Sequence, residues 1–234
     1  MNKLDMLYEG KAKKVFKTEE PDIYIIEYKD DATAFNALKK GTIQGKSVVN
    51  NKMSAILFEL LKKEDIPVHF IRLLSETEQE VKAVEIVPLE VIIRNVAAGS
   101  FSKRLGVEEG SELQNTIFEL CYKNDELGDP LINDYHATAL GLATTQEIKK
   151  MKELSFRIND ILIKFFRERA MRLIDFKVEF GRYKGEIILA DEISPDTCRL
   201  WEIGTNRKMD KDRFRRDLGD IEETYKEVLN KVQN

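Results

Sequence analysis

Residues 173–181 read Leu-Ile-Asp-Phe-Lys-Val-Glu-Phe-Gly, and residues 190–199 read Ala-Asp-Glu-Ile-Ser-Pro-Asp-Thr-Cys-Arg. In the first stretch Asp175, Lys177 and Glu179 alternate with apolar residues. This alternation predicts a β-strand with one apolar and one polar face. A strand face that only contacts solvent seldom needs an acidic, a basic and an acidic residue in fixed order. We therefore expect this polar face to line an active centre.

A second strand is expected over residues 186–192, after a turn that contains glycine. If the loop between the strands is centred on Tyr183, Asp191 lies opposite Asp175 and on the same face as Lys177. A register shifted by one residue would place Asp191 on the other face. Two carboxylates beside one lysine are suited to hold magnesium and phosphate.

The composition is that of a soluble globular protein, with 42% hydrophobic and 34% charged residues. No apolar run approaches the ~20 residues of a membrane span, and the N-terminus lacks the apolar core of a secretory signal. Two scattered cysteines give no disulfide framework, so we expect a cytoplasmic protein. A net charge of −4 argues against general nucleic-acid binding. Because there are only two histidines, zinc is disfavoured and a hard, oxygen-ligated metal is expected.

Two long helices are predicted from apolar periodicity. Ser47 is expected to cap the first, over residues 47–64. Thr144 and Glu147 form a capping box for the second, over residues 145–170. A charged C-terminal helix is expected to begin at Asp210.

Strands dominate the first hundred residues. Residues 77–80 are expected in a turn, and residues 99–143 are expected to be irregular. We therefore predict an α+β protein with antiparallel sheets and flanking helices, divided into a β-rich N-terminal lobe (1–85) and a larger C-terminal lobe (86–234). A ligand cleft is expected between the lobes. The expected strands lie at residues 7–8, 14–17, 23–28, 68–74, 81–84 and 89–95.

Two glycine-lysine motifs are candidate phosphate sites. In residues 10–13 (Gly-Lys-Ala-Lys) the glycine lets the backbone approach a phosphate, and Lys11 and Lys13 can face one side. On its own this motif is more typical of an ordinary hairpin with exposed lysines. Residues 41–47 resemble a Walker A loop, but three residues separate the glycines where four are needed. That interpretation is rejected, and a ligand contact by Lys46 is left open.

A second anion site is predicted near the end of the strand at residues 89–95. Arg94 shares a face with Glu90 and Ile92, and a tight turn at residues 99–100 adds a hydroxyl. Arg94 can bind a phosphate or carboxylate bidentately, although a surface ion pair explains it equally well. Pro195 stiffens the loop before Arg199, so Arg199 can reach the same anion. Together the motifs predict a cleft for ATP, magnesium and a phosphorylated, carboxylated substrate.

Six segments resemble conserved blocks of the SAICAR synthetase family, in the family's order. The resemblance implies a fold related to ATP-grasp enzymes and protein kinases, and the ATP-dependent ligation of L-aspartate to carboxyaminoimidazole ribotide (CAIR) in de novo purine synthesis. It is compatible with a homodimer. One departure is Asn36-Ala37, where members often have aspartate and glycine, which puts any acidic role there in doubt. The matching segments are residues 8–13, 48–52, 86–100, 173–181, 191–201 and 208–215.

For the nucleotide, Glu179 and Asp191 are expected to hold Mg²⁺. The resemblance implies that adenine meets the backbone at residues 82–84, from Lys82 to Val84. The turn that carries Gly10, Lys11, Ala12 and Lys13 is expected to contact the phosphates.

For the acceptor, Asp175 and Lys177 are expected to face the imidazole of CAIR and its carboxylate. Lys177 would stabilise the transferring group, and Asp175 is the candidate base. Lys211 and Arg215 are assigned to L-aspartate, although such charges are usually a solvated helix face. A small-molecule kinase and a catalytically silent nucleotide-binding module remain alternatives, whereas RNA binding is disfavoured by a pI near 5.5. The expected phosphate site of CAIR is formed by Arg94, Gly99, Ser100 and Arg199.

Overall fold

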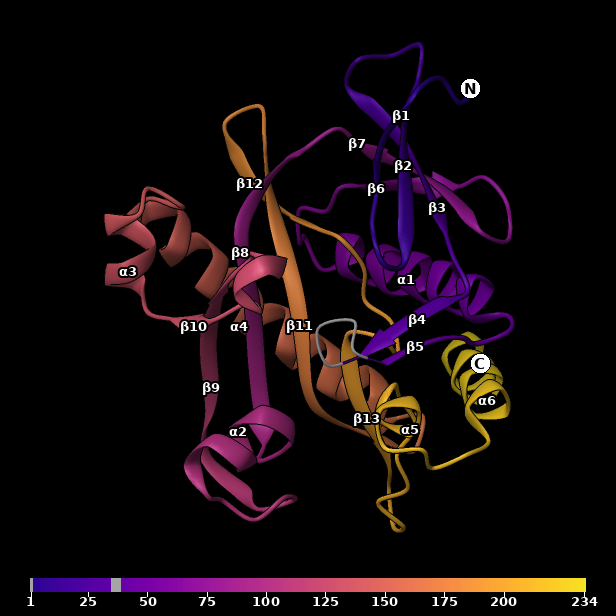
Figure 1. Ribbon diagram of the computed structural model, residues 1–234, viewed down its shortest axis with the longest axis vertical. Coiled ribbons are helices and arrows are strands. Elements are labelled where there is room, and N and C mark those ends of the chain that lie inside the picture. Colours follow the sequence, from indigo (N-terminus) through magenta and orange to yellow (C-terminus); the bar gives the residue numbers. More distant parts are fainter. Residues whose placement is uncertain (1, 35–38) are drawn as a thin grey trace.

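A computed structural model describes residues 2–34 and 39–234 and shows two large antiparallel sheets (Figure 1). The first sheet consists, in spatial order, of β1 (Met6–Glu9), β2 (Lys13–Lys17), β3 (Ile23–Tyr28), β7 (Glu78–Lys82) and β6 (Phe70–Leu73). A separate ribbon pairs β4 (Asp31–Ala34) with β5 (Lys39–Thr42).

The second sheet is built around two long strands. Its spatial order is β10 (Leu131–Ile132), β9 (Glu112–Tyr122), β8 (Glu85–Val96), β11 (Met171–Tyr183) and β12 (Glu186–Ala190), and β13 (Cys198–Glu202) also pairs with β11. The register places Asp175 opposite both Arg94 on β8 and Arg199 on β13. This pairing brings three distant segments of the sequence together.

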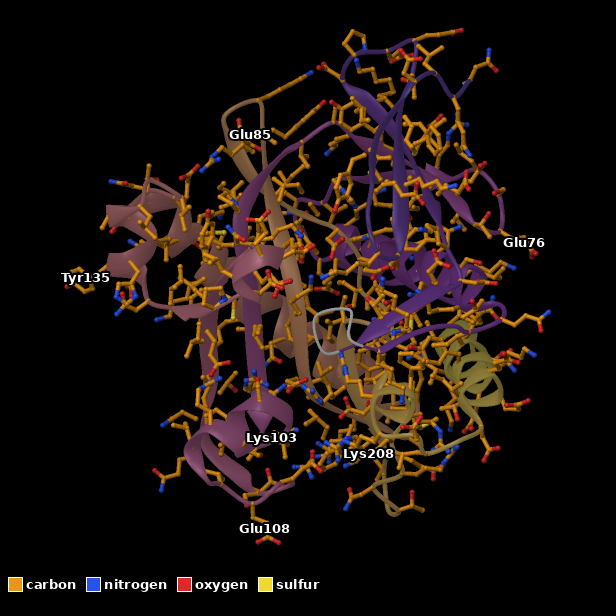
Figure 2. The ribbon with its side chains drawn as sticks, in the orientation of Figure 1. Glu76, Glu85, Lys103, Glu108, Tyr135 and Lys208 are labelled. Carbon is orange, nitrogen blue, oxygen red and sulfur yellow. The ribbon has the colours of Figure 1, made fainter. Side chains whose placement is uncertain are left out.

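Helices cover the sheets. Helix α4 (Thr145–Arg167) packs on β8 and β11, while α1 (Lys46–Lys63) packs against α6 (Ile221–Gln233). The short elements are α2 (Gly99–Leu105), the 3₁₀ turn η1 (Asp125–Leu127), α3 (Asp134–Ala139) and α5 (Asp212–Arg215). Tyr135 on α3 and Glu108 after α2 project from the periphery (Figure 2), away from the sheet centre.

The core explains the alternation in β11. Phe176, Val178 and Phe180 are buried in one large apolar cluster with the periodic residues of α4, such as Met151 and Ile158. Burial of such side chains contributes roughly 1.5–3 kcal/mol each. The predicted capping box of α4 is confirmed. No helix in the described ranges is long and apolar enough to cross a membrane.

Several expected boundaries were wrong. Residues 99–143 are not irregular, because they contain α2, β9, β10 and α3. Residues 78–80 belong to β7 and not to a turn. Gly99 and Ser100 form the first residues of α2, and the region after Asp210 contains two helices rather than one. Most side chains of β9 are only partly buried and do not alternate regularly between apolar and polar, so local patterning gave little sign of it.

The expected cap of α1 was also wrong. Gly45 is its N-cap residue, and the Ser47 side chain does not cap the helix. Asp30 performs this role from another segment, because its carboxylate accepts hydrogen bonds from the backbone N–H of Gly45 (3.1 Å) and of Ser47 (2.8 Å). A carboxylate satisfies free N–H groups at a helix start from any position that reaches them.

The expected register of the strand pair was wrong as well. Tyr183 pairs with Glu186, so the turn lies at Lys184 and Gly185 and strand β12 ends at Ala190. Asp191 therefore does not lie opposite Asp175. Asp191 has a left-handed backbone (φ 62°) immediately after the strand. Its Oδ2 nevertheless lies 3.6 Å from the Nζ of Lys177.

The division into lobes at residues 85 and 86 remains a prediction, although the change of sheet falls between β7 and β8. Asn36 and Ala37 lie outside the described residues.

Candidate active site

Lys177 lies among three carboxylates. Its Nζ is 2.7 Å from Oε1 of Glu179, 3.0 Å from Oε1 of Glu90 and 3.6 Å from Oδ2 of Asp191. Burial alone would lower the pKa of Lys177, but the negative charges of Glu179, Asp191 and Glu90 outweigh it and raise the pKa well above its ordinary value. Lys177 is therefore a fixed positive charge.

Lys13 approaches the same carboxylates from the first sheet. It forms an ion pair with Asp191, and its Nζ is 3.8 Å from Oε2 of Glu192. Burial would raise the pKa of Asp191, but Lys13 and Lys177 hold it below its ordinary range. The Oε2 atom of Glu192 is buried and has no hydrogen-bond partner, so this end of the site has an unused oxygen.

A cavity of about 460 Å³ opens beside these charges. One part is aliphatic and includes Val15, Ile26 and Val84, whereas the other contains Lys13, Lys177, Glu179 and Asp191. Gly181 packs so closely on Val84 that a Cβ on this glycine would lie 2.6 Å from the Val84 Cβ. An apolar wall with a charged end fits a planar base attached to phosphates.

Arg94 and Arg199 meet at one carboxylate. Asp175 Oδ2 accepts hydrogen bonds from Arg94 Nη1 at 2.8 Å and from Arg199 Nη1 at 2.9 Å. Arg94 also donates to Ser100 Oγ at 3.1 Å, while Arg199 donates to Asp212 Oδ2 at 3.0 Å. The two guanidinium groups are therefore held within reach of one anion.

Gly99 allows the close approach of Arg199. Its φ is +56°, and a Cβ added there would lie only 2.4 Å from Nη2 of Arg199. Any other residue would clash with the guanidinium and strain the backbone. This requirement explains a glycine at the start of α2.

The arginine pair lines a second cavity of about 340 Å³. The two cavities share Lys11, Glu90 and Lys177, so they adjoin at the Lys177 side chain. The second cavity is lined by six basic side chains but only three acidic ones, which favours a ligand with several negative charges. The basic residues are Lys11, Arg94, Lys177, Arg199, Lys211 and Arg215.

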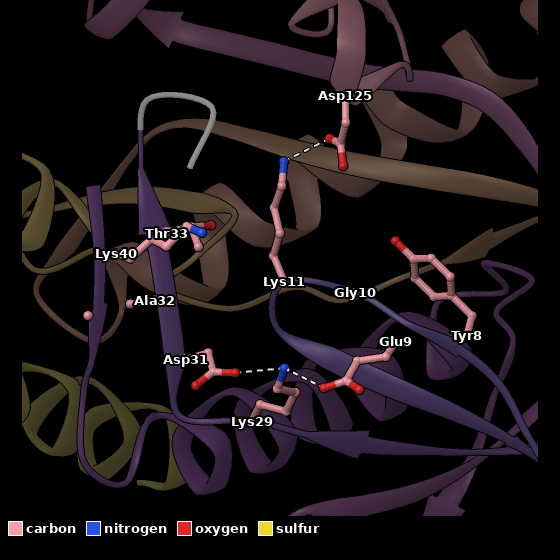
Figure 3. Close-up of a pocket in the computed structure, with 11 residues that line it drawn as sticks. Tyr8, Glu9, Gly10, Lys11, Lys29, Asp31, Ala32, Thr33, Lys40 and Asp125 are labelled. Atoms are coloured by element: carbon pink, nitrogen blue, oxygen red, sulfur yellow. Dashed lines mark hydrogen bonds and ion pairs between the residues drawn. The ribbon is translucent and has the colours of Figure 1, made fainter. Parts of the chain in front are cut away.

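Lys11 reaches from the β1–β2 turn to the second sheet. Its Nζ is 2.7 Å from Oδ1 of Asp125 on η1, across a third hollow of about 400 Å³ (Figure 3). In the same view Lys29 pairs with Glu9 and Asp31. Lys11 lines all three cavities, so the turn that carries it lies at their junction.

The structure brings most sequence-derived candidates together. Both residues assigned to L-aspartate, Lys211 and Arg215, line the second cavity with Arg94, Ser100 and Arg199. Lys46 is fully buried against Asp196, so it is not the open ligand contact that the sequence allowed. The first cavity contains Gly10, Lys11, Ala12, Lys13, Lys82, Val84, Glu179 and Asp191.

Four polar residues at the site were missed. Glu119 binds Arg94, Lys123 binds Glu179, and Glu192 and Asp196 line the cavities. Glu119 and Lys123 come from the overlooked β9 and its end. Glu192 and Asp196 could have been identified only from the sequence block at residues 191–196, which resembles the family.

The charged end of the first cavity contains carboxylates that are candidate metal ligands. Within the described residues no group of three or more candidate ligands is arranged to hold a metal by itself. Glu179, Asp191 and the unpartnered oxygen of Glu192 are nevertheless the hard donors that Mg²⁺ prefers. Because Mg²⁺ usually takes one or two carboxylates and completes its shell with water and substrate phosphates, the residues fit a nucleotide-bound magnesium.

Comparison with known proteins gives one consistent family. A family model described as SAICAR synthetase matches residues 6–232. The phosphoribosylaminoimidazole-succinocarboxamide synthase of Clostridium novyi (strain NT) is 62% identical over 229 residues, 98% of this chain and 97% of that protein.

Solved structures agree with that match. The phosphoribosylaminoimidazole-succinocarboxamide synthase of Ehrlichia chaffeensis has a TM-score of 0.96 and 46% identity, and the alignment covers 98% of each chain. A SAICAR synthetase in complex with ADP has a TM-score of 0.94 and 48% identity over 97% of each chain. The mixed arrangement of helices and antiparallel sheets is thus that of these enzymes.

Proposed function

The chain belongs to the SAICAR synthetase family, and on this premise we propose that its adjoining cavities carry out the ATP-dependent ligation of L-aspartate to the carboxylate of CAIR. The products are SAICAR, ADP and phosphate. The main support for this assignment is the position of Lys177. It lines both the cavity suited to a nucleotide and the cavity suited to a polyanion.

The reaction must activate a carboxylate. A carboxylate repels electron-rich nucleophiles and has a poor leaving group, so transfer of the γ-phosphoryl group from ATP would convert it to an acyl phosphate. The amine of L-aspartate would then attack the acyl carbon and expel phosphate. In the first step the protein mainly positions the reactants and neutralises charge.

The first cavity would hold ATP between the proposed lobes at residues 1–85 and 86–234, in the manner of ATP-grasp enzymes and protein kinases. Its aliphatic wall and the Lys82–Val84 backbone would receive adenine. Lys11 and Lys13, with the backbone at Gly10 and Ala12, would contact the phosphates. Glu179 and Asp191 would hold Mg²⁺, which supplies charge neutralisation between the phosphates when bound.

The second cavity would hold CAIR. Arg94, Ser100 and Arg199 would bind its phosphate at the end of the cavity that Gly99 keeps open to the Arg199 guanidinium. Lys177 would lie beside the CAIR carboxylate, where it can stabilise charge on the transferring phosphoryl group.

Asp175 remains the candidate base for the amine of L-aspartate. Its carboxylate is held by Arg94 and Arg199 in the structure. We propose that the CAIR phosphate competes for both guanidinium groups and so frees the carboxylate to accept a proton. Lys211 and Arg215 would receive the carboxylates of L-aspartate.

A cytoplasmic location and a homodimer complete the proposal. Both cysteines are free and buried, which a reducing compartment permits. Sedimentation of the purified protein would test the dimer.

The test is a coupled assay of ADP release with ATP, magnesium and CAIR, with and without L-aspartate. We expect ADP release to require both substrates and to match the SAICAR formed. ADP release indifferent to L-aspartate would support a kinase instead. Binding of ADP without turnover would support a catalytically silent module.

A further inference from the structure

Asp196 is the centre of a buried cluster in which only Lys211 has a role in the proposed mechanism. Its Oδ2 is 3.1 Å from the Nζ of both Lys46 and Lys211, and its Oδ1 accepts a hydrogen bond of 2.7 Å from the Tyr225 hydroxyl. These four residues are called the Asp196 cluster. They come from α1, the loop after β12, the segment before α5, and α6.

The charges of the cluster are unequal. Two ammonium groups face one carboxylate, and Tyr225 is a neutral donor because burial raises its pKa well above the ordinary value. The Lys46 side chain is fully buried, whereas that of Lys211 is 13% exposed. Since Lys211 lines the second cavity, its ammonium group is the part of the cluster that faces the acceptor substrates.

The cluster has little freedom to rearrange. The Ser54 hydroxyl donates to the Ile193 carbonyl at 3.1 Å, and the Lys211 backbone N–H donates to the Pro195 carbonyl at 3.0 Å. Tyr225 itself is 1% exposed. If the Tyr225 hydroxyl were lost, the Asp196 carboxylate would keep only its contacts with Lys46 and Lys211 and would move toward these two lysines.

We infer that Tyr225 of the C-terminal helix is a positioning residue for L-aspartate, because it orients Asp196 and thereby sets the Nζ of Lys211 in the second cavity. This inference rests on the proposed function and assigns α6, which lines none of that cavity, a role in substrate affinity. It also gives the lysine of the Walker-like segment a structural purpose, since Lys46 holds the opposite side of the same carboxylate.

The test is steady-state kinetics of full-length Tyr225→Phe, which keeps the ring and removes one hydrogen bond to a charged group. We expect the KM for L-aspartate to rise by up to about tenfold, less than the full effect of such a bond because Tyr225 bonds to Asp196 and not to the substrate, while the KM for ATP stays within about twofold. Thr224→Val is the matched control, because Thr224 is equally buried on α6 but its hydroxyl bonds only to the Asp220 carbonyl of its own helix. It should lower the melting temperature and leave both KM values unchanged.

A double-mutant cycle separates positioning from a general structural effect. In a Lys211→Met background, Tyr225→Phe should cause no further rise in the KM for L-aspartate. A full additional rise, or an equal rise in the KM for ATP, would overturn the inference. If Tyr225→Phe does not fold, Asp196→Asn is the second variant, and it should show the same selective loss for L-aspartate.

The wild-type enzyme keeps the two proposals distinguishable. If wild-type ADP release does not require L-aspartate, the proposed function fails. If it does, and folded Tyr225→Phe has wild-type KM values, only the positioning role fails.

Discussion

Replacing Gly99 by alanine should remove most activity in a protein that still folds. Gly99 has φ +56°, and an added Cβ would lie 2.4 Å from Nη2 and 2.6 Å from Cζ of Arg199. An ordinary contact begins near 3.4 Å, so the guanidinium must move by about 1 Å. That shift would break its hydrogen bonds to Asp175 (2.9 Å) and Asp212 (3.0 Å).

The stability cost has two parts. A non-glycine residue in the left-handed region costs roughly 1–2 kcal/mol, and the loss of the Arg199 hydrogen bonds to the buried Asp175 and Asp212 adds to it. Misplacing a binding group by about 1 Å can lower the rate about 10²-fold. We therefore expect kcat/KM for CAIR to fall by about two orders of magnitude in a protein that still folds cooperatively.

Gly106→Ala is the control. Gly106 ends the same helix with φ +66°, but a Cβ there would meet nothing within 4 Å. Both variants should lose the stability that the left-handed backbone costs, and Gly99→Ala should lose somewhat more in thermal melts, whereas only Gly99→Ala should lose ADP release at low CAIR concentration. Equal kcat/KM values for the two variants would refute the reasoning about Arg199.

Three further outcomes are expected. Lys177→Ala should reduce kcat at least 10²-fold, because the charge shared by both cavities is lost; turnover near the wild-type value in a folded variant would exclude its role. Asp191→Asn should weaken the Mg²⁺-dependent part of ADP binding measured by calorimetry, with EDTA-treated wild type as the reference; an unchanged magnesium effect would remove Asp191 from the metal site. The pKa of Glu147 is lowered to about 2, chiefly by its hydrogen bond from Arg182, so this carboxylate stabilises the fold above its ordinary pKa of 4.5 and loses that contribution as the pH falls toward 2. Melting temperatures of Glu147→Gln should therefore fall less steeply than those of wild type across this range, and identical slopes would contradict the assignment.

The sequence predicted the elements whose signals are local. The alternation in residues 173–181 identified β11, and the capping box identified the start of α4, because both patterns are read over a few residues. The cap of α1 was not predictable in this way, since Asp30 reaches it from outside the helix. Strand β9 was missed for a different reason: most of its side chains are only partly buried, so its sequence lacks a regular alternation of apolar and polar residues.

The candidate site shows the same limit. The sequence identified the basic residues, but it could not show that Asp175 holds Arg94 and Arg199 together, because that contact depends on a three-strand register. Asp191 was placed beside Lys177 from a register that proved wrong. Its left-handed backbone restores the contact with Lys177. The sequence does not show which aspartate adopts such a φ value.

The ion pairs of the site have a consequence for substrate binding. Each basic group proposed to contact CAIR already has an acidic partner: Asp175 for both arginines, and Glu179 and Glu90 for Lys177. Anionic substrates must therefore compete with these carboxylates, which keeps the buried charges compensated before binding. Because a phosphate can engage Arg94 and Arg199 together, it can displace Asp175 from both at once, whereas a single carboxylate has fewer oxygens to offer. The same exchange would expose Asp175 beside the second cavity, so binding of the phosphorylated substrate would itself prepare the base for the amine.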